Sequence, residues 1–116
     1  MTIDPIVVDC RLHASGAAVE LVVPDDLRYF QGHFPDMPIV PGVVQIKWAI
    51  TLARLYLRAG SAFRGMEALK FQQVMRAGAR VTLDLEYAEA TGKLRFSFAS
   101  ERGRYSSGRL FLRAAP

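Results

Sequence analysis

One histidine, His33, stands in a segment rich in proline and glycine and is the first candidate for chemistry in this chain. An imidazole takes up and returns a proton near neutral pH, so it can serve as a general base or acid. The same segment leads to Gly42 and Val43, where a helix is predicted to begin. A helix start presents free backbone N–H groups and the positive end of the helix dipole. A titratable group beside such donors is a candidate site, although His33 could also be a packed loop histidine.

Three prolines shape the segment that carries His33, because Pro35, Pro38 and Pro41 recur at a spacing of three. Each fixes its own φ, lacks an N–H and keeps the preceding residue out of the α region. The segment therefore can be neither a helix nor an inner strand. Residues 43–58 contain no Gly or Pro, and 11 of these 16 residues are apolar, which predicts a helix directly after the loop.

The polar residues of this predicted helix gather in one narrow stripe at about 100° per residue. The stripe consists of Lys47, Thr51, Arg54 and Arg58. Apart from Gln45, on the opposite side, the remaining surface is apolar. A helix that is apolar over most of its circumference must be wrapped by a sheet, and its charges make it unsuited to span a membrane.

Period-two alternation and turn residues predict about six strands around this helix. The predicted strands are residues 6–12, 18–23, 66–74, 80–87, 94–98 and 107–113, and residues 25–30 are predicted to form one helical turn. Two strands, one long helix and a meander of strands make an α+β fold with an antiparallel sheet. We expect one domain over residues 1–116, without repeats or linkers.

Composition narrows the function classes. Cys10 is the only cysteine and no signal peptide is apparent, which favours a reducing, cytoplasmic compartment. Two distant histidines and one cysteine make no metal site, and we expect no cofactor. The net charge is +4, and 12 of the 15 basic residues are Arg. No nucleic-acid motif accompanies them, so the charge indicates either a plain basic surface or an acidic protein partner.

The loop and helix start together resemble a known family. The pattern Gly32-His33-Phe34-Pro35-x-x-Pro38-x-x-Pro41-Gly42-Val43 resembles the active-site loop of the hot-dog-fold 3-hydroxyacyl-[acyl carrier protein] dehydratases. Its continuation to Gln45 and Trp48 is most similar to the small dehydratases of aryl-polyene-type pathways. Residues 69–78 resemble the family's strand that enters an R-P-G-D turn, with Ala77 and Ala79 in place of the usual Pro and Asp.

This resemblance implies a hot-dog fold and a role for each part of the motif. His33 would remove the proton at C2 of a 3-hydroxyacyl thioester, and the backbone N–H of Gly42 or Val43 would hold the thioester oxygen. The acyl chain would lie in a tunnel. The residues expected to line it are Phe30, Phe34, Met37, Pro38, Gln45 and Trp48, although these aromatic side chains could equally belong to the core. Gln45 would orient a water or the hydroxyl group or, alternatively, cap loop backbone groups.

Lys47 departs from the family pattern. The family places a carboxylic acid 14 residues after the histidine, where it assists the leaving hydroxyl from the partner subunit's helix, and here that position is Lys47. Three interpretations remain open: a surface lysine, a lysine whose lowered pKa lets it donate a proton, or a site with lost or altered activity.

The expected partners follow from the same resemblance. The substrate would arrive on acyl carrier protein, and the chain would form a homodimer or a higher even oligomer, with no nucleic acid and no membrane. The predicted carrier surface comprises Arg64, Lys70, Arg76 and Arg80. The best function is dehydration of 3-hydroxyacyl thioesters in fatty-acid or polyene-type biosynthesis. The alternatives are an impaired subunit that binds carrier protein or an active paralogue, and an acyl thioesterase.

Overall fold

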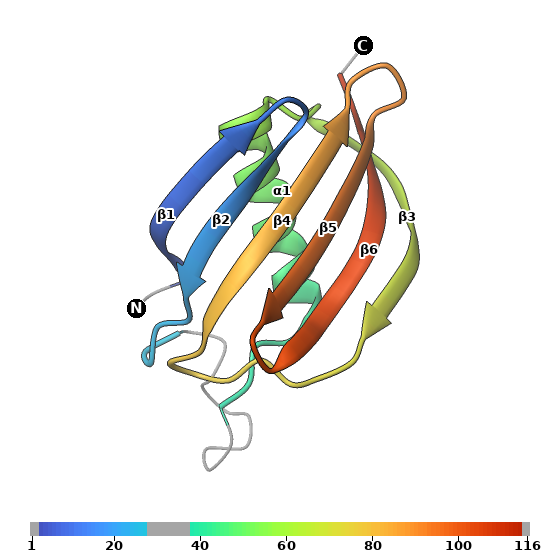
Figure 1. The fold of residues 1–116 in the computed structure, drawn as a ribbon. Coiled ribbons are helices and arrows are strands. Elements are labelled where there is room, and N and C mark those ends of the chain that lie inside the picture. Colours follow the sequence, from blue (N-terminus) through green and yellow to red (C-terminus); the bar gives the residue numbers. More distant parts are fainter. Residues whose placement is uncertain (1–2, 28–37, 115–116) are drawn as a thin grey trace.

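A single long helix lies against one face of a six-stranded antiparallel sheet (Figure 1). The computed structural model describes residues 3–27 and 38–114. The strands follow the order β1-β2-β4-β5-β6-β3 across the sheet. The elements are β1 (Ile6–His13), β2 (Gly16–Val22), α1 (Gly42–Leu57), β3 (Ala62–Phe71), β4 (Arg80–Ala88), β5 (Lys93–Ser100) and β6 (Gly103–Arg113). This is the α+β hot-dog arrangement that the sequence predicts.

The core lies between the helix and the inner face of the sheet. Along β4, Val81, Leu83 and Leu85 are buried, while the residues between them face outward, as period two requires. Trp48, Leu52 and Ile46 are the largest buried apolar side chains of α1. Nonpolar side chains from both layers therefore leave water together, which is the main favourable term in folding.

The helix presents to solvent the stripe that its sequence predicts. Lys47, Thr51, Arg54 and Arg58 are all exposed. The helix ends at Arg58, whose φ of 55° is left-handed, and Arg54 donates from Nη2 to the Ser61 carbonyl at 2.8 Å. No helix in the described ranges is long and apolar enough to cross a membrane.

Three of the element boundaries that differ from the predictions lie on β3 and β6. β3 begins at Ala62 rather than residue 66, because Gly65, with φ of 148°, lets the strand pass through a bulge. It stops at Phe71, since the amides of Gln72 and Gln73 both donate to the one Tyr105 carbonyl, at 2.8 and 3.4 Å, and the regular pairing with β6 ends there. β6 begins at Gly103 instead of residue 107. The predicted helical turn is also wrong in its described half: Asp25 and Asp26 form a turn, and Leu27 is an extended residue buried in the core.

The two edge strands leave apolar side chains uncovered. On β3, Met66 lies opposite the buried Leu110, so it faces the core side of the sheet, yet 47% of its surface is accessible. Phe63 and Phe71 on the same strand are exposed to a similar degree. On β1, Ile6 and Leu12 are exposed as well. Uncovered edges of this kind are where another chain can add to a sheet.

Candidate functional site at the helix start

The first turn of α1 presents unpaired backbone donors. Pro41 caps the helix with an extended ψ of 148°, and its carbonyl accepts from the amides of Val44 and Gln45 at 3.0 and 3.2 Å. Within residues 3–27 and 38–114, no backbone carbonyl accepts the amide hydrogens of Gly42 or Val43. The first turn also holds no acidic residue. The positive end of the dipole is therefore free to stabilise a negative oxygen.

The β3–β4 loop, residues 72–79, fixes where the helix starts. The Val40 amide donates to the Met75 carbonyl at 2.7 Å, and the Ala77 amide donates to the Pro38 carbonyl at 3.2 Å. Ile39 and Arg76 form an isolated antiparallel bridge between these bonds. Residues 38–40, which lead into the helix, are thus paired with residues 75–77 of the loop in the manner of two short antiparallel strands. The loop also contains the predicted turn at Ala77 and Gly78.

The Gln45 side chain is buried and bonded inside the protein. Its Nε2 donates to the Val40 carbonyl at 3.1 Å, and its Oε1 accepts from the Ser106 hydroxyl at 2.7 Å. This matches the capping alternative given by the sequence. Trp48 is also buried, and its indole N–H donates to the Ile3 carbonyl at 3.1 Å. Pro38 is half-buried and lies three residues before the helix cap. The tunnel role of these three residues stays a prediction.

Gly42 packs closely against a neighbouring aromatic ring. A Cβ at this position would lie 2.7 Å from Cε1 and 2.8 Å from Cζ of Phe71. The phenyl group at the end of β3 therefore occupies the side of the helix start that the absent Cβ leaves open.

Four predicted site residues lie outside the described residues. They are His33, Phe30, Phe34 and Met37. Their roles remain predictions from the motif. The described chain resumes at Pro38, three residues before the helix cap, so the motif leads directly into the helix start.

Lys47 is exposed on the outer face of α1. It lies one turn beyond Val43, of which 72% is accessible. Neither a hydrogen bond nor an ion pair holds its ammonium group to another described residue. Within one chain, Lys47 therefore has the environment of a surface lysine.

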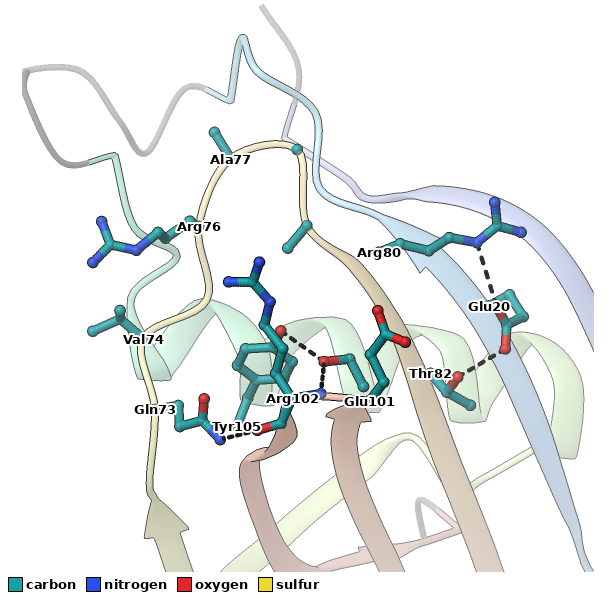
Figure 2. Close-up of a pocket in the computed structure, with 13 residues that line it drawn as sticks. Glu20, Gln73, Val74, Arg76, Ala77, Arg80, Thr82, Glu101, Arg102 and Tyr105 are labelled. Carbon is teal, nitrogen blue, oxygen red and sulfur yellow. Dashed lines mark hydrogen bonds and ion pairs between the residues drawn. The ribbon is translucent and has the colours of Figure 1, made fainter.

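The four predicted carrier-binding cations do not form one surface. Arg76 and Arg80 border an open hollow of about 960 Å³ at the same end of the molecule as the helix start (Figure 2). Lys70 borders a second hollow, of about 430 Å³, on the outer face of the sheet. Arg64 borders neither, because it lies near the opposite end of β3. Arg102, which the sequence reasoning missed, joins Arg76 and Arg80 in the first hollow.

Arg80 is partly engaged by an acidic neighbour. Its Nε lies 3.6 Å from Glu20 Oε2, and the Thr82 hydroxyl donates to Glu20 Oε1 at 2.7 Å. The Thr82 hydrogen bond, followed by the Arg80 guanidinium, lowers the pKa of Glu20 against the opposing effect of desolvation. Arg76 has no such partner among the described residues. It is therefore the more available of the two cations for an acidic partner.

The sequence reasoning also missed Ser106 and Phe71 as supports of the helix start. Ser106 lay just before the strand predicted over residues 107–113, and its polar side chain gave no sign that β6 would begin at Gly103 and bury it. For Phe71, the sequence indicated only that it belongs to the stretch that resembles a strand of the dehydratase family. Among residues 3–27 and 38–114, no three side chains gather that could hold a metal ion.

Comparison with known proteins gives a consistent result. A sequence model of the ApeI-like family, described as ApeI dehydratase, matches residues 10–109. A 3-hydroxyacyl-[acyl-carrier-protein] dehydratase FabZ from Oenococcus oeni is 36% identical over 65 residues, which cover 50% of this chain and 47% of that protein. FabZ from Ruminiclostridium cellulolyticum is 38% identical over 65 residues, with 50% and 46% covered. The chain thus matches about half the length of these curated relatives.

Solved structures extend the similarity to nearly the whole chain. A chain of the dehydratase heterocomplex ApeI:P from Xenorhabdus doucetiae superposes with a TM-score of 0.86 at 30% identity, covering 93% of this chain and 96% of that one. An uncharacterized protein from Erwinia carotovora subsp. atroseptica gives a TM-score of 0.76 at 31% identity, with 91% and 93% covered.

Proposed function

We propose, from the premise that this chain belongs to the ApeI-like dehydratase family, that it eliminates water from 3-hydroxyacyl thioesters carried on acyl carrier protein. The product would be the 2-enoyl thioester. The observation that carries the proposal is the helix start, where the amides of Gly42 and Val43 lack described partners and no acidic residue opposes them. Such a site suits the negative oxygen that develops on a thioester when C2 loses a proton.

His33 is the proposed base. Its imidazole would take the proton from C2, and the electron pair would move through the enolate-like intermediate to form the C2–C3 double bond. The hydroxyl group at C3 leaves with the C–O electron pair and needs one proton to become water. The imidazolium formed at His33 carries such a proton, so the elimination balances even where no carboxylic acid is present.

A homodimer is part of the proposal, because the face that would complete the site is uncovered in one chain. The inner side of β3 exposes Phe63, Met66 and Phe71, and the helix start exposes Val43. Pairing of two β3 edges about a twofold axis would cover these groups with the same surface of a second copy. This arrangement would bring Lys47 of the partner subunit towards the site.

The first hollow, which Arg76, Arg80 and Arg102 border, is the proposed binding site for acidic carrier protein. It lies at the same end of the molecule as the helix start, and Arg76 and Arg102 lack ion-pair partners in the described part of the chain. Exposed charges of this kind give salt-sensitive association. Lys70 and Arg64, which lie elsewhere, would contribute less.

The test is turnover of a 3-hydroxyacyl thioester on acyl carrier protein by the purified chain, followed by mass spectrometry of the acyl group. Dehydration predicts loss of one water with the thioester intact. Release of a free acid and a free carrier thiol would instead identify a thioesterase. An unchanged substrate under conditions where the protein binds carrier would contradict the enzymatic proposal.

A second candidate rests on Lys47. If the family's carboxylic acid at this position is essential, the chain would be an impaired subunit that binds carrier protein or supports an active paralogue. Lys47 carries the opposite charge to that carboxylic acid and has no ion-pair partner among the described residues, which favours this candidate. Mixing the chain with an active paralogue should then raise the paralogue's turnover, whereas the chain alone would show none.

A further inference from the structure

Two polar residues stand out in the core. Gln45 and Ser106 are 3% and 0% exposed, and they are the buried polar residues in the described part of the chain. Gln45 is in the first turn of α1, and Ser106 is on β6, 61 residues later. Burial of an amide and a hydroxyl is costly unless both are hydrogen-bonded, so a structural reason for the pair is required.

The hydrogen bonds fix how the Gln45 amide is oriented. The Val40 carbonyl can only accept, so the amide NH₂ must face it, at 3.1 Å. The amide oxygen is then left to accept from the Ser106 hydroxyl at 2.7 Å. One side chain therefore joins the residue before Pro41 to the strand that lies beneath the helix start.

The Val40 carbonyl needs this donor because of how the helix begins. The amides of Val44 and Gln45 both donate to Pro41, so neither reaches the Val40 carbonyl. Pro41 itself has no N–H. Val40 is buried, and without the Gln45 amide its carbonyl would have no donor among the described residues.

Ser106 also lies next to the other group that touches the helix start. It is directly opposite Phe71 in the β3–β6 ladder, and the Phe71 ring lies against Gly42. Gly42 is thus held on one side by the ring and, through Val40 and Gln45, by the Ser106 hydroxyl. Both supports come from adjacent positions of the sheet.

We propose that Gln45 and Ser106 are positioning residues, which hold the amides of Gly42 and Val43 in the orientation that the thioester oxygen requires. The inference rests on the proposed dehydratase function, and it assigns Gln45 to the backbone rather than to the substrate. A shift of these amides by about 1 Å would lower the rate of the chemical step much more than it lowers the affinity for the substrate.

The experiment separates positioning from general stability by removing one partner and then both. Ser106→Ala leaves the buried Gln45 oxygen without a donor, which destabilises a fold. Replacing both groups, as in Gln45→Met with Ser106→Ala, removes both side-chain polar groups, so that no side-chain polar group of the pair is left unpaired. The Val40 carbonyl still loses its donor in this double variant. Ser107→Ala is the matched control, because Ser107 is the next residue of β6 and borders the outer hollow.

The double variant should have a thermal midpoint no lower than that of Ser106→Ala, but its kcat should be about 10- to 100-fold below that of the parent, with KM changed by about twofold at most. The carbonyl stretching frequency of a bound ¹³C-labelled enoyl thioester of N-acetylcysteamine should shift towards its value in water, since the hydrogen bonds to the thioester oxygen weaken. Ser107→Ala should leave kcat and the frequency unchanged. A kcat that recovers together with the thermal midpoint would overturn the proposal.

Amide hydrogen exchange keeps the inference testable if the parent shows no turnover, an outcome that refutes the proposed function. The amides of Val44 and Gln45 donate to Pro41, so they report how firmly the helix start is held. Their exchange should be about 10-fold faster in the double variant than in the parent and in Ser107→Ala. Equal exchange in all three proteins would overturn the positioning role, whatever the enzyme assay gives.

Discussion

The phenyl ring of Phe71 lies against the α-carbon of Gly42, so closely that a Cβ on Gly42 would come within 2.7 Å of the ring. One residue ends an edge strand and the other begins the helix. Their contact fixes the spacing between the β3 edge and the proposed oxygen-binding amides. A second chain that covers β3 would therefore touch a ring that already packs on the helix start.

This contact predicts a non-additive pair of substitutions. Gly42→Ala alone should lower the free energy of unfolding by about 1 kcal/mol, because the added methyl group displaces the ring. In a Phe71→Ala background the same change should be neutral or stabilising, since alanine is the better helix former. Urea denaturation of the four proteins of this double-mutant cycle measures the coupling. Strictly additive effects would show that the ring is not against Gly42.

His33→Ala should lower kcat by about 10²- to 10⁴-fold, the usual loss when a general base is removed. His13→Ala is the matched control, because His13 lies at the end of β1, where its Nδ1 is 3.7 Å from Glu86. The control should keep the parental rate. Steady-state turnover of the 3-hydroxyacyl thioester compares the two. An unchanged rate in His33→Ala would show that His33 is not the general base, which would refute the proposed mechanism.

Substitution of Lys47 separates its three interpretations. An exposed lysine without described partners predicts that Lys47→Ala leaves kcat unchanged. A proton-donating lysine predicts a loss comparable to that of His33→Ala, with a pH–rate profile set by an amine. A decayed site predicts no parental activity and partial rescue by Lys47→Asp or Lys47→Glu. Turnover of the parent and the three variants between pH 6 and 10 distinguishes them, because only a lysine whose pKa is lowered from its usual value of about 10.4 would titrate within this range.

Reversing the charge of the first hollow should weaken carrier binding. In Arg76→Glu with Arg102→Glu, the dissociation constant for acyl carrier protein should rise by about 10-fold, and its dependence on salt should become shallower. Arg64→Glu changes the same kind of charge away from both hollows and should have little effect. Titration calorimetry at two salt concentrations gives both quantities. Equal weakening by Arg64→Glu would point to net charge rather than to this hollow.

The proposed dimer predicts that a charge on the edge strand β3 prevents dimerisation, whereas a charge on the edge strand β1 does not. Met66→Asp places a charge on the inner side of β3 and should convert the dimer to a monomer at micromolar concentration, because pairing would bury that charge without a partner. Leu12→Asp makes the same kind of change on the exposed β1 edge and should leave the dimer intact. Light scattering at matched concentrations measures both. A monomeric parent would contradict the dimer.

The sequence alone determined the architecture, because its strongest signals are periodic. The apolar run after Gly42, with its stripe from Lys47 to Arg58, could only be a helix packed on a sheet, and the alternation in β4 and β5 indicated the strands that cover it. The proline spacing and the family pattern located the candidate site at the start of that helix. Each of these signals is local, since it depends on residues a few positions apart.

Tertiary structure decided which distant residues support the helix start. Ser106 bonds to Gln45 across 61 positions, and Phe71 reaches Gly42 from the end of the edge strand β3. It also separated Arg64, near the start of β3, from Arg76, in the loop that follows this strand. No periodicity encodes these pairings, because they depend on strand order, on the bulges that shift the β3 register and on where the β3–β4 loop meets the helix cap. Such contacts form only when the whole sheet is assembled around the helix.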